Sequence, residues 1–161
     1  QASAMRRRNF LFLLMGAGWP ETEAETLSGK KVMLPLVFGG KPAVVVWSFS
    51  KTAGEKTRDW LQPLTQANLN AWGAAMLEAA PRFVRPLIRG GMKKQMNGPM
   101  QDRQLLLYKD EKGWRGRLGL KDDALPLVVI LDGAGEVAWS RAGEFQASAF
   151  SEIRERLKSL K

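Results

Sequence analysis

The chain has no cysteine and no histidine among its 161 residues. Without cysteine it cannot form a disulfide, bind zinc through thiolates or use a thiol as a nucleophile. Without histidine it lacks the commonest metal ligand and the side chain most suited to proton transfer near neutral pH. We therefore expect no catalytic residues, no metal site and no cofactor. Thiol oxidoreductase and peroxidase activities are excluded on the same ground, and the chain is not expected to be an enzyme.

Other signatures of chemistry are also missing. The glycine pairs Gly39-Gly40 and Gly90-Gly91 are isolated and do not form a phosphate-binding loop. The adjacent carboxylates Asp122 and Asp123 have no further ligands nearby in the sequence, so they do not predict a cation site. What is present is 45% hydrophobic residues, which is enough for one folded domain with a core of its own.

Acidic residues are few relative to basic ones. The chain has 25 lysines and arginines against 16 acidic residues, a net charge of +9. Such an excess suits an anionic partner, such as phospholipid headgroups, nucleic acid or an acidic protein surface. Ordinary solubility is the alternative explanation. Nucleic acid is the least favoured partner, because no recognised nucleic-acid-binding module is present.

The first 18 residues form a segment of their own. Arg6, Arg7 and Arg8 precede the short apolar run Phe10 to Met15, an order similar to that of a signal peptide or a twin-arginine signal. The run is too short to span a bilayer, which takes roughly 20 residues. A signal remnant, a cloning remnant and a short helix on the domain or on a membrane all remain open. We expect one domain over residues 19–161 and favour a membrane-associated or exported (periplasmic) location over a cytoplasmic one.

Hydrophobic patterning predicts strands alternating with helices. Residues 26–35 predict a hairpin that turns at Ser28-Gly29-Lys30, after a polar linker over residues 21–25. The β-branched run 43–49 predicts a strand buried on both faces. Further strands are predicted at 103–108, 127–131 and 136–141, and helices from Thr52 onward and at 81–96, 114–120 and 148–161. The pattern of 69–77 fits a strand or a helix, and analogy with other α/β folds favours a strand. This order predicts an α/β fold with a central mixed sheet flanked by helices and an N-terminal β-hairpin.

Several segments resemble the thioredoxin-like group that includes the redoxins and TlpA-like proteins. The hairpin at Thr26–Lys30, the strand Val44–Phe49, Leu125-Pro126 and the turn Leu131–Glu136 carry the resemblance, in the order found in that group. The resemblance implies a thioredoxin-like fold over roughly residues 18–160. It also implies a cis peptide bond before Pro126, opposite the position at which the fold normally places its thiol.

A narrower resemblance is to the thioredoxin-like assembly factor of the mitochondrial F-type ATP synthase. Trp19-Pro20, Leu34-Pro35, the basic segment 82–94 and the stretch 135–139 carry it. That family implies a chaperone for a membrane subunit of the synthase, without redox chemistry.

The former active-site loop is the first candidate site. The resemblance places Ser50, Lys51, Thr52, Glu55 and Pro126 there, with Glu55 where a peroxiredoxin would have its nucleophile. Thr52 and Glu55 also fit a capping box that simply starts a helix, which explains both without any chemistry. Recognition of an anion or peptide by backbone N–H groups at the helix start is the functional alternative.

A basic, amphipathic helix is the second candidate site. Arg82, Arg85, Arg89 and Lys93 recur at helical spacing, and Phe83, Leu87, Ile88 and Met92 occupy much of another face. This pattern suits a membrane surface or an acidic partner, and equally a helix that packs its apolar face on the core. Trp114 and Arg115 form a third candidate, an aromatic and basic pair for an acidic partner. We expect Trp47, Trp60 and Trp139 in the core.

Together these features predict a thioredoxin-fold binding protein without redox function. An assembly factor or chaperone for a membrane-associated client is the favoured function. An anionic-lipid or nucleic-acid binder is the first alternative, and a residual redoxin-type enzyme without thiols is the second. The client and the oligomeric state are not determined by the sequence.

Overall fold

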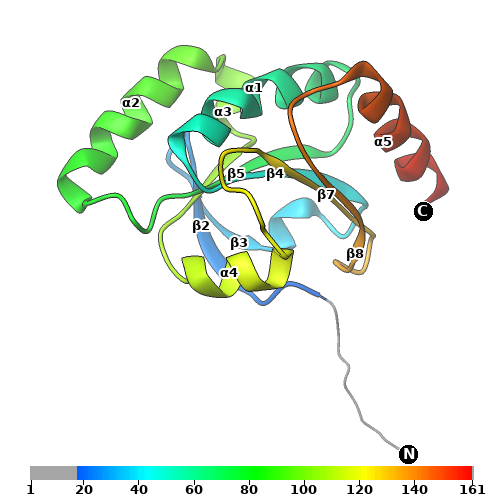
Figure 1. The fold of residues 1–161 in the computed structure, drawn as a ribbon, viewed down its shortest axis with the longest axis horizontal. Coiled ribbons are helices and arrows are strands. Elements are labelled where there is room, and N and C mark those ends of the chain that lie inside the picture. The colour runs from blue at the N-terminus through cyan, green and yellow to red at the C-terminus, as the bar shows by residue number, and fades with distance from the viewer. Residues whose placement is uncertain (1–17, 161) are drawn as a thin grey trace, which may run out of the picture.

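A seven-stranded mixed sheet forms the centre of the molecule, with the strand order β3-β2-β6-β5-β4-β7-β8 (Figure 1). The computed structural model describes residues 18–160, so the predictions for residues 1–17 lie outside it. The strands are β2 (Thr22–Thr26), β3 (Lys31–Leu34), β4 (Ala43–Ser48), β5 (Ala71–Met76), β6 (Gln104–Leu107), β7 (Leu127–Leu131) and β8 (Val137–Ala142). The helices are η1 (Leu36–Phe38), α1 (Lys51–Gln66), η2 (Arg82–Val84), α2 (Arg85–Gln95), α3 (Gly98–Gln101), α4 (Glu111–Leu118) and α5 (Ala147–Ser159).

The central strands are those with continuous apolar runs. Every residue of β4, β5, β6 and β7 is buried, because both faces of the sheet are covered. Strands β4, β5 and β6 run parallel, whereas β7 pairs antiparallel with β4 and β2 pairs antiparallel with β6. The predicted mixed sheet with helices on its faces is therefore confirmed.

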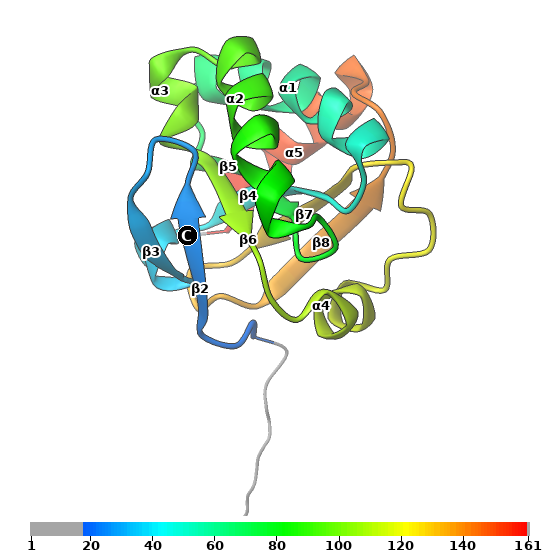
Figure 2. The ribbon, with the colours of Figure 1, turned by 90° about the vertical axis from the view of Figure 1, so that its left-hand side faces the viewer.

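The two faces of the sheet have different cores. On one face, Val44 and Val46 of β4 pack with Trp60, Leu61 and residues of α3 and α5. On the other face, Val45 and Trp47 pack with η1 and α4. The alternation follows from the two-residue period of a strand. Figure 2 shows the layers, with α1, α3 and α5 on one side of the sheet and α4 on the other.

The polar linker predicted at residues 21–25 is wrong, because β2 occupies Thr22–Thr26. Its residues alternate, so that Ala24 and Thr26 are buried while Glu23 is exposed. The glutamates therefore mark the outer side of a strand rather than a linker. The hairpin itself is confirmed, since β2 and β3 pair antiparallel around Ser28-Gly29-Lys30.

The tryptophans also differ from expectation. Trp47 and Trp60 are in the core as predicted, but Trp139 on the edge strand β8 is only half-buried. Trp19 and Trp114 instead pack against Trp47, with ring centroids 5.5 and 4.7 Å away respectively. Trp114 has no exposed surface. It cannot be a partner contact in this structure, because its indole fills the core beneath α4.

Two further features concern the ends of the described chain. Gly18, the first described residue, forms an isolated antiparallel bridge with Glu136. Between residues 18 and 160, no helix combines the length and the apolar character needed to cross a membrane.

Candidate functional site

The first turn of α1 is stabilised by an N-cap residue. Ser50 is the N-cap residue, and its hydroxyl oxygen accepts a hydrogen bond from the backbone N–H of Ala53 at 3.1 Å. The same hydroxyl donates to the backbone carbonyl of Asp123 in the loop before β7. The predicted capping box is therefore wrong, because the N-cap is Ser50, two residues before Thr52, and Thr52 lies inside the helix.

The side chain of Arg115 in α4 lies next to this helix start. The Arg115 guanidinium donates to Glu111 at 2.9 Å and to Asp123 at 3.1 Å, and it lies 5.4 Å from the centre of the Phe49 ring. The hydrogen bond with Glu111, then that with Asp123, raises the pKa of Arg115, so this side chain is charged at every working pH. Arg115 thus has a structural role, in that it fixes the Asp123 loop over the end of β4.

Pro126 begins the strand beside this loop, but its peptide bond is not the cis bond that the resemblance implied. In the described part of the chain the cis bond is Leu34–Pro35. Pro126 is buried, its carbonyl accepts from the Gly143 N–H at 2.9 Å, and Leu127 pairs at once with Trp47 and Ala142. The chain therefore enters β7 fully extended, which the ordinary trans bond permits.

The structure brings Ser50, Lys51, Thr52, Glu55 and Pro126 to one end of the sheet. Lys51, Thr52 and Glu55 are exposed. Across residues 18–160 no three histidine, cysteine or acidic residues group in a way that could hold a metal ion. The hydrogen bond between Ser50 and Asp123 ties the start of α1 to the loop before β7.

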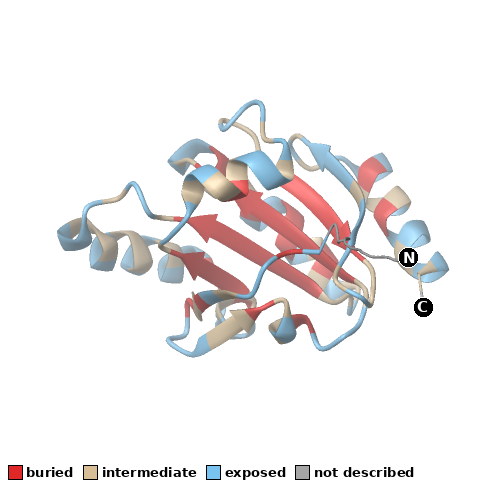
Figure 3. Ribbon diagram, turned by 90° about the horizontal axis from the view of Figure 1, so that it is seen from below, coloured by how far each residue is buried: buried red, intermediate tan, exposed pale blue. Residues whose placement is uncertain are grey.

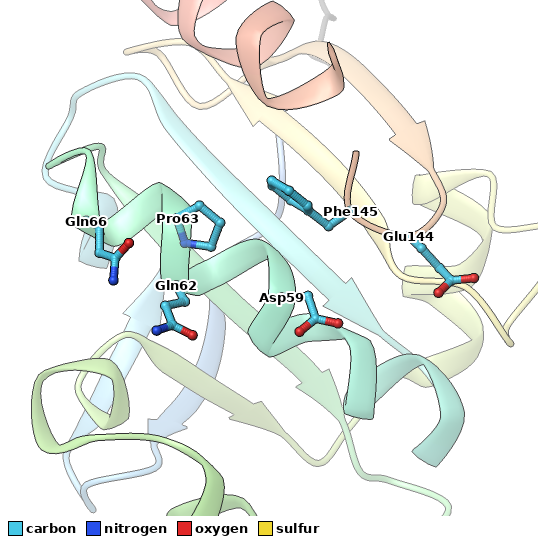
Figure 4. Close-up of a pocket in the computed structure, with 6 residues that line it drawn as sticks. All are labelled: Asp59, Gln62, Pro63, Gln66, Glu144 and Phe145. Atoms are coloured by element: carbon cyan, nitrogen blue, oxygen red, sulfur yellow. The ribbon is translucent and has the colours of Figure 1, made fainter. Parts of the chain in front are cut away.

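A hollow of about 420 Å³ lies on the flank of α1, away from this end. It is lined by Asp59, Gln62, Pro63, Gln66, Glu144 and Phe145. Figure 4 shows that these side chains do not converge, since Gln62 and Gln66 point away from Phe145. We assign no ligand to it.

In the second candidate site, η2 and α2, the structure exposes part of the predicted apolar face. Phe83 is 84% exposed and Leu87 is 78% exposed, which fits the expected binding surface better than the alternative of a helix packed on the core. No residue of α2 is buried, and Figure 3 shows this helix extending beyond the red, buried sheet.

The arginines explain this orientation. Arg85 donates to the carbonyl of Ala80 at 2.9 Å and to that of Glu78 at 3.3 Å, and its guanidinium lies 4.8 Å from the centre of the Tyr108 ring. Arg89 donates to the Tyr108 hydroxyl at 3.2 Å. Two of the four predicted basic contacts therefore face the protein and attach the helix to the end of β6. Arg82 and Lys93 are exposed as predicted.

The sequence left open whether the face with Phe83 and Leu87 is exposed or packed on the core. A helix with a basic face and an apolar face does not show by itself which of the two faces inward. The available signal was Tyr108, a polar aromatic residue just after a strand, which offers a ring face and a hydroxyl to arginines.

Comparisons with known proteins identify the fold. No protein-family model matches the chain, and no curated protein matches its sequence. Among solved structures, the crystal structure of yeast Sco1 has a TM-score of 0.63 at 12% identity, covering 90% of this chain and 97% of that one. BsSco, a member of the Sco family of cytochrome c oxidase assembly proteins, has a TM-score of 0.62 at 11% identity, covering 88% and 92%.

An exposed lipoprotein thioredoxin, Etrx1 of Streptococcus pneumoniae, is similar to the same extent. Its TM-score is 0.61 at 14% identity, and the alignment covers 88% of this chain and all of that one (100%). Identities this low show the fold and nothing finer. The chain has a thioredoxin-like fold, as predicted, and carries none of the cysteines with which a thioredoxin would exchange disulfides.

Proposed function

We propose that this protein is a non-redox thioredoxin-fold binding protein that acts in the assembly of a membrane-associated protein. The observation that carries the proposal is the surface made by Phe83 and Leu87 on η2 and α2, two large apolar side chains exposed beside several cations. Large apolar side chains that lie together on a surface mark interaction sites more often than isolated ones do. At the former active-site loop, by contrast, the Ser50 hydroxyl is already bonded to the Ala53 N–H and to the Asp123 carbonyl.

Two further points support an assembly role. The solved structures with the same fold include proteins described as cytochrome c oxidase assembly proteins. The sequence also resembles a thioredoxin-like assembly factor of the ATP synthase, a family without redox chemistry. On this proposal the protein works in an exported or membrane-associated compartment, where such clients are assembled.

A second candidate function is binding to an anionic lipid surface. Its supporting observation is the charge of the same region, in which five cations and no acidic residue lie between Pro81 and Gln101. Each cation close to an anionic bilayer contributes about 1 kcal/mol.

The test is affinity capture from detergent-solubilised membranes of the source cell. Wild type is compared with the double variant Phe83→Ser/Leu87→Ser and with the control Leu36→Ser, which removes a leucine that is 70% exposed elsewhere on the surface. We expect one membrane-associated protein to be retained by wild type and by the control at moderate salt, and lost from the double variant. Equal recovery by all three, or no specific protein at all, would contradict the proposal.

A further inference from the structure

The exposed side of η2 and α2 continues beyond its two apolar residues. Phe83 and Leu87 are one helical turn apart, and Gly90 and Gly91 follow three and four positions after Leu87, on the same side. Both glycines lie inside α2, and all four residues are exposed. We call these four residues the α2 outer face.

No contact among residues 18–160 requires glycine at positions 90 and 91. A Cβ atom built at either would meet no atom within 4 Å, and neither residue has a positive φ. Glycine inside a helix costs roughly 0.5–1 kcal/mol relative to alanine. The pair leaves the helix backbone uncovered directly beside Leu87, so that another backbone can come close there.

The charges around the α2 outer face are of one sign. Arg82, Lys93 and Lys94 are exposed, and none of them forms an ion pair with another described residue. The exposed charged side chains of η2 and α2 near the apolar pair are thus all cations: Lys94 is seven positions after Leu87, on the same side, and Arg82 and Lys93 lie along one edge. A surface complementary to the α2 outer face is apolar in the middle and acidic at its edges.

We propose that the α2 outer face receives one helix of a partner protein, whose apolar stripe is flanked by aspartates or glutamates. The proposal rests on the proposed function and specifies the chemistry of its client. The helix packs over Leu87 and crosses at Gly90-Gly91, where the missing side chains shorten the distance between the two axes. Its carboxylates meet Arg82, Lys93 and Lys94.

The glycines distinguish a helix from a bilayer. A helix that inserts into lipid gains binding energy from each bulky apolar side chain on its inserted side, so two glycines weaken it. A helix that packs closely against another helix gains from small residues at the crossing point. Replacing the glycines by leucine therefore has opposite effects on the two kinds of binding.

The experiment measures the affinity of the whole chain for defined probes by fluorescence anisotropy and co-sedimentation. The probes are an amphipathic helical peptide of roughly five turns with a leucine stripe flanked by glutamates, the same peptide with lysines in place of the glutamates, and vesicles of phosphatidylcholine with phosphatidylglycerol. The variants are Gly90→Leu/Gly91→Leu and Phe83→Ser/Leu87→Ser, with Leu36→Ser as the control. Thermal unfolding of each variant establishes that it is folded.

We expect the glutamate-flanked peptide to bind wild type and Leu36→Ser at least about tenfold more tightly than the lysine-flanked peptide, which is a difference of about 1.4 kcal/mol. Both double variants should lose at least about fivefold of this affinity while staying folded. Equal binding of the two peptides, no binding of the glutamate-flanked one, or unchanged binding by Gly90→Leu/Gly91→Leu would overturn the inference. Vesicle binding that increases in Gly90→Leu/Gly91→Leu would overturn it in favour of a membrane surface.

The two proposals fail separately. If membranes yield a specific partner that Phe83→Ser/Leu87→Ser loses, but the glutamate-flanked peptide does not bind, the assembly role stands and the helical, acidic client does not. If no specific partner is captured, the assembly role fails whatever the peptides do.

Discussion

Helices α5 and α2 have similar lengths and similar mixtures of apolar and basic residues, yet the fold uses them in opposite ways. Helix α5 buries Ala149 and Ile153 against the sheet, and Phe150 and Leu157 pack at the edge of the same core. Helix α2 has no fully buried residue: Met92 packs at the edge of the same core, and Leu87 is left in solvent. Figure 1 shows the two helices at opposite ends of the molecule, with α5 beside β7 and β8 and α2 projecting past the sheet.

The charges of the two helices differ in the same sense. In α5, Arg156 pairs with Glu152 at 2.9 Å and Lys158 with Glu155 at 3.5 Å. In α2 the cations have no acidic neighbour along the helix. Helix α5 thus makes its apolar contacts and its ion pairs within the chain. Helix α2 leaves apolar and charged side chains without such contacts, and for this reason we call it a binding surface.

The largest expected effect compares apolar truncation in the two helices. Ile153→Ala removes a fully buried side chain and should lower the free energy of unfolding by about 2–5 kcal/mol. Leu87→Ala should change it by no more than about 0.5 kcal/mol, because the leucine is already in water. Urea unfolding of both variants measures the difference, and a large loss in Leu87→Ala would mean that α2 packs on the protein after all.

A smaller effect is expected from the glycines. Gly90→Ala/Gly91→Ala should raise the free energy of unfolding by about 1–2 kcal/mol in total, because both positions are helical and have room for a methyl group. The matched change in α5, Ala149→Gly, should lower it by about 1 kcal/mol or more, since it also removes a buried methyl group. The same urea measurements test this, and destabilisation by the alanines would show that the glycines serve the fold.

The central sheet was predictable from the sequence because its signals are local. The β-branched run at 43–49 and the apolar run at 127–131 can be buried only as central strands, and the structure contains them as β4 and β7. A proline kinks a helix or lies in its first turn, and Pro86 lies in the first turn of α2, so the regular helix begins after the start of the predicted range 81–96. The start of α1 was missed by two residues, since Ser50 and Thr52 are both good capping residues and the choice depends on Asp123, which is far away in sequence.

The candidate sites were less predictable, because each depends on which neighbour a residue meets. Trp114 is close to arginines in the sequence, but its ring packs in the core against Trp19 and Trp47. Arg85 and Arg89 have the spacing of a basic surface, but Tyr108 turns them inward. In both cases a contact between segments distant in sequence determines which way the side chain faces. The local sequence pattern does not indicate that contact.

The smallest expected effect concerns charge, and it shows whether the ion pairs of α5 really complete that helix. Glu152→Gln should lower the free energy of unfolding by about 0.3–0.5 kcal/mol at low salt, because Glu152 accepts from Arg156 and lies 3.9 Å from Arg141, and all three are partly exposed. The loss should vanish near 1 M salt, where the screening length falls to about 3 Å. Lys93→Gln in α2 should cost nothing at either salt concentration, since it breaks no ion pair and removes one like charge from a row of cations. A loss of stability in Lys93→Gln would reveal an acidic contact within the chain, and the α2 outer face would then have less need of an acidic partner.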